Sequence, residues 1–364
     1  MTRLTVVAAL AVASLAAGLA ASGSQSQTQR FRAGVDVVPV YVTVRDRERG
    51  FVLDLAKDDF ELRDDGRLQA IEQFTTTVTP LSTVVLIDGS GSMLGEFKRV
   101  LDGANNFVLR MLPEDRTLIG SFADRAVFSR RFSSDRDELL GYLEDQFNLR
   151  IGGETHLWEA LRDAAAELTA ERGKRVVLAM SDGYNFALPP DYYRPQTSSA
   201  PPIVGPPGRK PIGIGGRNPG VSSLPGQPAP TPRTGVGNPN IGDPSRNGVP
   251  PEQARAAAVA TDVIVYAVSM WVRDGVKTQK PSHVLEELAV ETGGAFFRVD
   301  ENDDMNTTFT EIVQQLRQQY VLGFTPRAFD GRQHKLSVRV KRPGLDVQAR
   351  KSYIATRDRS PGLH

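Results

Sequence analysis

The chain of 364 residues contains no cysteine, which excludes disulfides, thiolate metal ligands and lipid attachment through a cysteine. It also lacks an excess of charge of either sign, because its formal net charge is only +1. This balance argues against nucleic acid and against a strongly anionic membrane surface as partners. A hydrophobic content of 40% instead indicates a globular protein of one or two domains, held together by its core.

The sequence also lacks the common signatures of hydrolases and nucleotide-binding enzymes. Its four histidines form no H-E-x-x-H pair, and neither a G-x-S-x-G elbow nor a phosphate-binding loop is present. We therefore expect that the protein is not an enzyme. A Ser–His–Asp triad assembled only by the fold is an alternative that the sequence leaves open.

Residues 1–24 are expected to be a secretory signal peptide. Arg3 precedes an uncharged apolar stretch, which gives way to small residues and then to serine and glutamine. An uncleaved anchor is the alternative, since this stretch approaches the roughly 20 residues of a membrane span. We expect no integral span after cleavage, because no later stretch is apolar enough. The predicted location is the periplasm, the cell envelope or the medium.

Strand patterns occupy both ends of the expected mature chain. Residues 33–78 contain a valine-rich stretch with a period of two and a hairpin signal at Asp65-Gly66. Residues 320–356 contain three such stretches, with a turn predicted at 342–344 and a single last strand at 345–354. We predict that the two end segments pair into one small β-sandwich.

Residues 81–319 alternate apolar strands with helical patterns. The apolar stretch at 81–88 precedes a helix pattern near 95–112, and the alternation continues to the end of this segment. It predicts an α/β domain with a doubly wound, mostly parallel sheet. Residues 189–250 interrupt the pattern with 16 of the chain's 24 prolines, which predicts a disordered insertion.

Oxygen-bearing side chains follow the strands of this domain at the points where the strands end. Asp88, Ser90 and Ser92 alternate in the stretch TVVLIDGSGSM, so their side chains can converge in an extended turn. Thr155 precedes a helix and Asp182 ends another buried strand. Ligands of open α/β sheets bind beyond the carboxyl ends of the strands, and Mg²⁺ takes oxygen ligands. The five residues therefore predict a site for Mg²⁺ or Mn²⁺.

Each of these residues also has a structural interpretation. Asp88 and Ser90 could form a metal-free turn whose oxygens accept backbone hydrogen bonds, Thr155 could cap a helix, and Asp182 could belong to a simple turn. The neighbouring side chains are expected to have ordinary roles, with Glu154 and His156 exposed to solvent and Trp158 half-buried.

The arrangement resembles the metal-ion-dependent adhesion site of von Willebrand factor type A domains. DGSGS matches the D-x-S-x-S motif, and the threonine before a helix and the SDG at a strand end match the remaining positions. LAVETGGAFFRV resembles a late helix–strand segment of these domains, and the flanks DVVPVYVTVRD and YVLGFTP resemble a bacterial, exported subgroup, the VWFA-related proteins. The resemblance covers nearly the whole mature chain except the insertion.

The resemblance implies that Ser90, Ser92 and Thr155 bind the cation through neutral hydroxyls, while Asp88 and Asp182 act directly or through water. A carboxylate of Asp or Glu on a partner protein would then complete the shell. It thus implies an adhesion-type module that binds a protein ligand without turnover. The alternatives are a metal-indifferent structural or assembly protein of the cell envelope, and a metal-assisted hydrolase.

The expected insertion suggests a further hypothesis about the cation site. It begins close to Asp182, and its own carboxylates Asp191 and Asp243 could occupy the open metal position until a partner displaces them. The sequence specifies neither the partner nor the oligomeric state.

Overall fold

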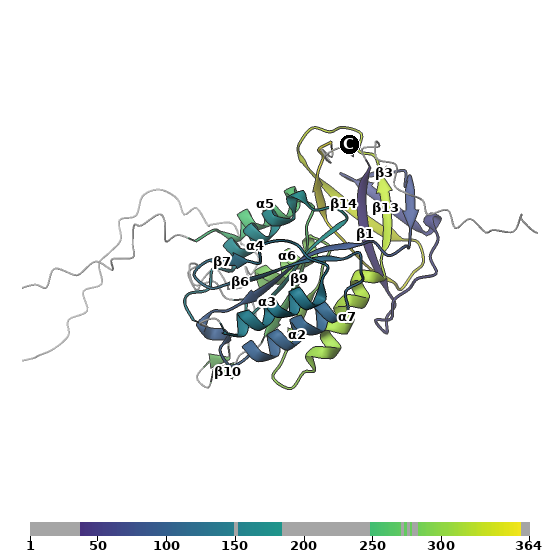
Figure 1. Cartoon of the computed structure of the whole chain (residues 1–364). Helices are drawn as coiled ribbons and strands as arrows, with labels where there is room; N and C mark the ends of the chain where they lie inside the picture. The colour runs from purple at the N-terminus through teal and green to yellow at the C-terminus, as the bar shows by residue number, and fades with distance from the viewer. Residues whose placement is uncertain are drawn as a thin grey trace, which may run out of the picture. The chain divides into compact units, whose positions relative to one another are not determined.

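A computed structural model describes residues 37–148, 152–183, 248–270, 273–274, 277–278 and 283–357. It contains a six-stranded sheet between two layers of helices, together with two four-stranded antiparallel sheets (Figure 1). The predicted α/β class, with a mostly parallel sheet and flanking β-strands, is confirmed. The expected signal peptide and residues 189–247 of the expected insertion lie outside the described residues. Within the described part of the chain, no helix has the length and apolar character needed to cross a bilayer.

The six-stranded sheet has the order β12-β9-β8-β5-β6-β7, and its edge strand β7 is antiparallel to its neighbour. Its strands are β5 (Leu81–Asp88), β6 (Arg116–Phe122), β7 (Ala126–Phe128), β8 (Lys174–Ser181), β9 (Ile264–Met270) and β12 (Phe296–Val299). All residues of β5 and β9 are buried, as expected for parallel strands that are covered on both faces. The small strands β10 (Arg273–Asp274) and β11 (Lys277–Thr278) pair separately.

Among the described residues, three helices cover each face of this sheet (Figure 1). On one face lie α2 (Phe97–Leu109), α3 (Arg136–Asn148) and α7 (Met305–Arg317), and on the other α4 (Leu157–Glu167), α5 (Pro251–Ala260) and α6 (His283–Glu291). Successive residues of β5 serve the two layers, because side chains alternate along a strand: Val85 and Ile87 join the first core, and Val84 and Leu86 join the second. Short 3₁₀ turns are η1 (Lys57–Asp59), η2 (Gly91–Met93) and η3 (Leu168–Ala170).

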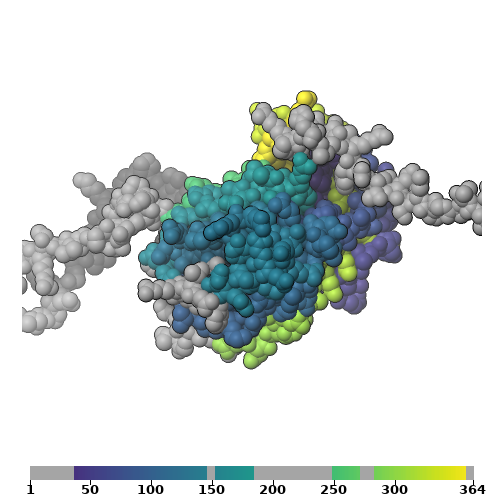
Figure 2. Space-filling model, in the orientation of Figure 1, coloured from purple at the N-terminus to yellow at the C-terminus, as the bar shows by residue number. Residues whose placement is uncertain are grey.

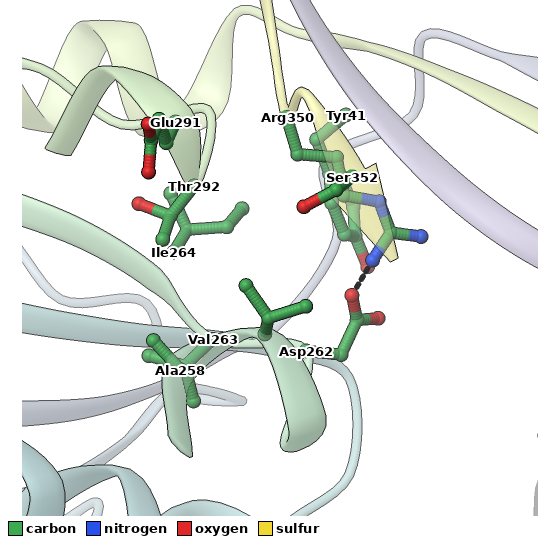
Figure 3. Close-up of a pocket in the computed structure, with 10 residues that line it drawn as sticks. Tyr41, Ala258, Asp262, Val263, Ile264, Glu291, Thr292, Arg350 and Ser352 are labelled. Atoms are coloured by element: carbon green, nitrogen blue, oxygen red, sulfur yellow. Dashed lines mark ion pairs between the residues drawn. The ribbon is translucent and has the colours of Figure 1, made fainter. Parts of the chain in front are cut away.

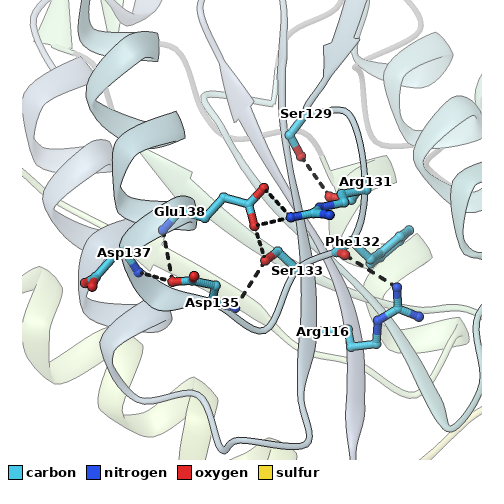
Figure 4. Close-up of polar contacts among 8 residues, drawn as sticks. All are labelled: Arg116, Ser129, Arg131, Phe132, Ser133, Asp135, Asp137 and Glu138. Carbon is cyan, nitrogen blue, oxygen red and sulfur yellow. Dashed lines mark hydrogen bonds and ion pairs between the residues drawn. The ribbon is translucent and has the colours of Figure 1, made fainter.

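Helix α3 starts at a capped N-terminus (Figure 4). Asp135 Oδ1 accepts from the backbone N of Asp137 at 3.0 Å and of Glu138 at 3.2 Å. Glu138 in turn accepts from Ser133 Oγ at 2.5 Å and pairs with Arg131 at 3.2 Å. The cap satisfies backbone donors that the helix itself leaves free, and it fixes α3 to the segment that follows β7.

The two antiparallel sheets form a β-sandwich around a single core cluster, which includes Val40, Leu62, Tyr320, Phe324 and Leu336. Their orders are β15-β1-β13-β4 and β16-β14-β2-β3. The strands are β1 (Val38–Arg45), β2 (Phe60–Asp64), β3 (Arg67–Gln69), β4 (Gln73–Thr75), β13 (Tyr320–Phe324), β14 (Gln333–Val340), β15 (Asp346–Ala349) and β16 (Ser352–Ile354). Each sheet therefore combines strands from both ends of the chain, and Figure 2 shows purple and yellow residues on the same side of the molecule.

The prediction of a single last strand at 345–354 is wrong. The chain crosses from one sheet to the other at Arg350 and Lys351, which separate β15 from β16. There Lys351 N donates to Glu291 O of α6 at 2.9 Å, and Arg350 Nη2 donates to Pro39 O at 2.5 Å. These bonds to the α/β domain and to β1 replace the strand pairing that a continuous strand would require.

The β-sandwich and the α/β domain are joined through buried polar contacts. Arg350 lies beside a small cavity that Tyr41, Ile264 and Thr292 also line, and it forms an ion pair with Asp262 (Figure 3). Burial lowers the pKa of Arg350 to about 10, against the opposing effect of two nearby tyrosines. The ion pair partly offsets the cost of holding this guanidinium away from water.

A second polar contact between the two bodies centres on Lys174, at the start of β8. Its Nζ donates to Leu316 O at 2.9 Å and to Gln319 Oε1, and Gln319 Nε2 donates to Thr43 Oγ1 of β1 at 2.8 Å. Burial holds the pKa of Lys174 well below its usual value. The amine thus ties the end of α7 to the sheet it covers and, through Gln319, to the sandwich.

Candidate metal site

The carboxyl ends of β5 and β8 meet where the order of the sheet reverses. After β5 the chain moves to β6 and β7 on one side, and it then returns to β8 on the other side of β5. Ligands of open α/β sheets bind at such a switch point. Asp88 is the last residue of β5, and Asp182 directly follows β8. Both are at least 95% buried, with 0% and 5% of their surface exposed.

The Asp88 carboxylate is held by hydrogen bonds from both sides. Ser181 Oγ donates to its Oδ2 at 2.5 Å, and Ser90 N donates to its Oδ1 at 2.9 Å. Burial, and after it the charge of Asp182, raises the pKa of Asp88 even though these hydrogen bonds lower it. Two carboxylates that share a buried site repel each other, and a cation beside them would relieve this repulsion.

The two serines that follow Asp88 bring their hydroxyls together. Ser90 Oγ lies 3.1 Å from Ser92 Oγ. Met93 closes the η2 turn and is fully buried, so its side chain anchors this loop in the core. Leu94, the next residue, is 64% exposed. The predicted convergence of the two hydroxyls beside Asp88 is therefore seen in the structure.

Thr155 lies in a loop that is bound to the ends of two other strands. Gly152 N donates to Gly89 O in the β5 loop at 3.0 Å, and His156 N donates to Ala123 O after β6 at 3.1 Å. These bonds fix the loop on either side of Thr155, which is itself buried. The loop therefore lies at the same edge of the sheet as the other predicted ligands.

A carboxylate beyond the end of β6 supports the same loop. Asp124 Oδ1 accepts from Glu154 N at 2.7 Å. Gly153 has a φ of +98°, and a Cβ there would lie 2.7 Å from the same oxygen. Only glycine combines this backbone conformation with so close an approach of a side chain. Asp124 and Gly153 therefore fix the conformation of the loop next to Thr155.

Helix α4 begins directly after this loop, and its N-cap is His156. The alternative in which Thr155 caps the helix is therefore wrong. His156 is only 17% exposed, with Nδ1 lying 3.0 Å from Glu159 Oε2, and Trp158 is fully buried. The expectations of an exposed His156 and a half-buried Trp158 are wrong, because the start of α4 packs into the core of its layer. Glu154 is exposed, as predicted.

Residues 83–185 match the family of the von Willebrand factor type A domain. The chain carries a von Willebrand factor type A (VWA) domain. The match begins within β5 and ends just after β8, so it contains all five predicted ligands. No curated protein matches the chain.

Several solved structures are similar to this chain. An aerotolerance-related membrane protein from Bacteroides fragilis NCTC 9343 is 15% identical, and the match covers 65% of this chain and 98% of that one, with a TM-score of 0.38. BatB from Bacteroides thetaiotaomicron is 15% identical, and the match covers 65% of this chain and 98% of that one, with a TM-score of 0.39. Proximal thread matrix protein 1 from the mussel byssus, with a zinc occupied MIDAS motif, is 13% identical. The match covers 68% of this chain and 48% of that one, with a TM-score of 0.42. At these identities the likeness concerns the fold alone.

We call the five side chains at this edge of the VWA domain the metal edge: Asp88, Ser90, Ser92, Thr155 and Asp182. The structure brings the first three into direct contact and places Asp182 close enough to raise the pKa of Asp88. Thr155 lies in the adjoining loop, where Gly153 O accepts from Gly91 N at 3.5 Å. Their role as cation ligands stays a prediction.

Two residues of this site were not predicted from the sequence. Ser181 lies within the SDG stretch, one position before the predicted ligand, and its side chain bonds to Asp88. Asp124 follows the end of β6. A search for polar side chains after every predicted strand, rather than after the two most apolar ones, would have found Asp124.

The donor set of the metal edge fits a hard divalent cation. It offers two carboxylates and three hydroxyls, and oxygen is the ligand that Mg²⁺ and Mn²⁺ prefer. Both oxygens of Asp88 already accept hydrogen bonds from Ser181 and Ser90 N. Each of these oxygens keeps a second lone pair, so both roles expected for Asp88, direct and through water, stay predictions.

Proposed function

We propose that the VWA domain binds a partner protein through Mg²⁺ or Mn²⁺ held at the metal edge. The observation that supports this most is the buried pair Asp88 and Asp182 at the topological switch point, beside two hydroxyls 3.1 Å apart. In this proposal Ser90, Ser92 and Thr155 hold the ion, and the two aspartates offset part of its charge, directly or through water.

The bound ion would supply an electrophilic position for an oxygen anion. Three of its proposed ligands are neutral hydroxyls, so its charge is only partly neutralised by the domain. The carboxylate of an Asp or Glu on the partner is the proposed occupant of the remaining position. The proposal is recognition without turnover, and it assigns no catalytic residue.

The exposed side chains around the metal edge suggest what else the partner would meet. Leu94 follows the serine loop and is 64% exposed, while Glu154 is exposed beside Thr155. A partner carboxylate with an apolar neighbour would gain contact area against Leu94. A second acidic group near Glu154 would instead be repelled.

We further propose that the protein is exported and acts in the periplasm, the cell envelope or the medium. The support is the apolar N-terminal stretch followed by small and polar residues. The similarity of the flanking strands to the exported VWFA-related subgroup adds to this support.

Thermal unfolding of the full mature chain tests the metal part of the proposal. Addition of Mg²⁺ or Mn²⁺ after EDTA treatment should raise the Tm, because an ion that binds only the folded state stabilises it. Asp88→Ala should abolish the shift. Asp102→Ala removes an exposed carboxylate of α2 that pairs with Lys98, and it should leave the shift intact. Equal shifts in the two variants would contradict the proposal.

Recovery of partners on the immobilised chain tests the recognition part. Proteins of the native envelope fraction should be retained in Mg²⁺ and lost in EDTA or with Asp88→Ala. Retention that survives both treatments would favour the metal-indifferent structural alternative. Metal-dependent turnover of an ester or peptide substrate that disappears in Asp182→Ala would favour the hydrolase alternative instead.

A further inference from the structure

A second group of metal-ligating side chains lies in the β-sandwich, apart from the VWA domain. We call Asp64, Asp65 and His334 the sandwich cluster. Asp64 ends β2, Asp65 belongs to the turn between β2 and β3, and His334 lies on β14, the strand that pairs with β2. One oxygen of each carboxylate and one ring nitrogen all lie within 4.8 Å of one another.

The three donor atoms converge on the Nδ1 side of the imidazole ring. His334 Nδ1 lies 3.2 Å from Asp64 Oδ1 and 3.1 Å from Asp65 Oδ2. Ligands around a tetrahedral Zn²⁺ with bonds of about 2.0–2.1 Å are about 3.3 Å apart. The nitrogen-to-oxygen distances of the cluster are therefore close to those of two edges of such a tetrahedron.

Each donor is also held from behind by a second partner. Asp64 Oδ2 accepts from Tyr353 Oη at 3.2 Å, and Asp65 Oδ1 accepts from Lys335 N at 2.9 Å. These bonds leave the other oxygen of each carboxylate directed at His334. Metal-binding carboxylates and histidines are oriented by outer partners of this kind.

The histidine has the outer partner that is typical of a metal ligand. His334 Nε2 lies 3.1 Å from Asp330 Oδ1, which also accepts from Arg332 N at 2.9 Å. A proton on Nε2 is thereby directed to a carboxylate, and the lone pair of Nδ1 is left facing two further carboxylates. Either a proton or a metal ion on Nδ1 would then meet the two carboxylates.

A single proton on Nδ1 would be shared between the two carboxylate oxygens in a three-centre hydrogen bond, which aligns less well with each of them than a direct bond. A divalent cation can contact all three atoms together and carries the charge to balance both carboxylates. Burial of the charged groups also favours a divalent cation over a proton. The side chain of Asp64 is 6% exposed and that of His334 is 16% exposed, whereas that of Asp65 is 53% exposed. Solvent can therefore reach the cluster on the side of Asp65.

We propose that the sandwich cluster is a second divalent-cation site, in which Asp64, Asp65 and His334 bind Zn²⁺ and water supplies the fourth ligand. The nitrogen ligand distinguishes it from the all-oxygen metal edge, because imidazole suits Zn²⁺ whereas Mg²⁺ prefers oxygen. The proposed role of the ion is structural, because a bound Zn²⁺ would link the β2–β3 turn to β14. This proposal is independent of the function proposed for the VWA domain.

Zn²⁺ titration of the full mature chain, after EDTA treatment and dialysis, tests the proposal by calorimetry. The chain should carry Asp88→Ala, so that the metal edge does not contribute. We expect one Zn²⁺ per chain, with affinity reduced at least 100-fold by His334→Gln or by Asp64→Asn. Asp65→Asn changes an exposed turn residue and covers the case in which the buried Asp64 variant fails to fold. His283→Gln, at the start of α6, is the matched control and should bind Zn²⁺ as tightly as the parent chain.

Nitrogen-15 NMR of the imidazole rings provides a second readout. Zn²⁺ should shift the Nδ1 resonance of His334 to that of a metal-bound nitrogen and leave Nε2 protonated. Absence of Zn²⁺ binding in the Asp88→Ala chain would overturn the proposal and leave a protonated imidazole paired with carboxylates. Zn²⁺ binding that persists unchanged in His334→Gln and Asp65→Asn would overturn it as well.

Discussion

The metal edge and the sandwich cluster bring their donor atoms together in different ways. In the VWA domain the donors come from loops at the carboxyl ends of parallel strands, where the sheet topology leaves an open crevice. In the β-sandwich they come from a tight turn and from the strand that pairs with it. A parallel sheet thus assembles loops from distant parts of the chain, whereas the antiparallel sheet brings a turn against the side chain of a neighbouring strand.

The two groups also differ in what fixes each donor. At the metal edge, Asp88 accepts two hydrogen bonds, and the Thr155 loop is fixed mainly through backbone bonds to adjoining loops. In the sandwich cluster every donor residue has a further hydrogen-bond partner outside the cluster. We therefore expect the metal edge to be more sensitive to loop conformation, and the sandwich cluster to be more sensitive to outer side chains.

Glycine substitutions beside the two groups should show the largest difference. Gly153 (φ +98°) approaches the Asp124 carboxylate, whereas Gly66 (φ +80°) in the β2–β3 turn has open space around it. Gly153→Ala should cost about 2–3 kcal/mol if the loop keeps its shape, from backbone strain and the clash together. If the loop moves instead, Mg²⁺ affinity should fall by roughly 30–100-fold, in line with the same free energy.

Gly66→Ala serves as the matched comparison. It should cost about 1 kcal/mol through backbone conformation alone, and it should leave Mg²⁺ affinity unchanged. Unfolding curves and Mg²⁺ titrations of both variants measure these effects. A Gly153→Ala protein with normal stability and normal Mg²⁺ affinity would show that the loop next to Thr155 is not fixed as the structure indicates.

Removal of an outer partner should affect the sandwich cluster next most strongly. Asp330→Ala should weaken Zn²⁺ binding by about 10–100-fold, because the His334 ring loses the group that orients it. Asp330→Asn keeps an oxygen acceptor for Arg332 N and for the ring, so its effect should be smaller. Neither change should alter Mg²⁺ affinity at the metal edge. Equal loss at both sites would indicate general destabilisation rather than loss of the outer partner.

The separation of the donor residues along the chain explains how much of each group could be predicted from the sequence. Asp88, Ser90 and Ser92 are separated by two positions each, so one extended turn is enough to predict that they converge. Asp182 required only the rule that parallel strands end at one edge, whereas Thr155, which precedes a helix, was assigned through its match to the threonine position of the family motif. By contrast, 270 positions separate Asp64 and His334, and their approach depends on a strand pairing between the two ends of the chain.

The fold shows the same limit. Helical periodicity predicted the helices of the VWA domain, which bury one face each, and continuous apolar runs predicted its central strands, which are buried on both faces. Such patterns failed at Arg350, where the bonds of the chain to α6 and to β1 decide that one apparent strand becomes two. They also misjudged Trp158, whose burial depends on the packing of α4 against the sheet rather than on the local pattern.

Loss of a single hydroxyl from the metal edge should have a moderate effect. Thr155→Ala should weaken Mg²⁺ binding by about tenfold, since one neutral ligand contributes on the order of 1–1.5 kcal/mol. Thr155→Ser keeps the hydroxyl and should restore most of the affinity. The stability of the metal-free protein should change little, because the N-cap of α4 is His156 and not Thr155. A loss of metal-free stability as large as the loss of binding free energy would point to a structural role instead.

The smallest expected effect is a pH dependence of the metal-free sandwich cluster. Burial lowers the pKa of His334, but the hydrogen bond with Asp330 and the charges of Asp64, Asp65 and Asp330 outweigh it and raise the pKa. A histidine whose pKa is higher in the folded than in the unfolded protein stabilises the fold fully below the unfolded value of about 6.5. This stability is lost as the pH rises through the pKa of the folded protein.

Unfolding of the Asp88→Ala chain in EDTA, between about pH 6 and pH 8, measures this dependence against a chain that also carries His334→Gln. The difference should be less than about 1 kcal/mol, because the cluster is partly open to solvent and its charges are screened. With Zn²⁺ present the sign should reverse, since the ion competes with the proton for Nδ1 and binds better as the pH rises. If the free energy of unfolding changes with pH in the same way with and without Zn²⁺, the cluster binds only a proton. The sandwich cluster would then be an ion pair, in contrast to a metal site at the metal edge.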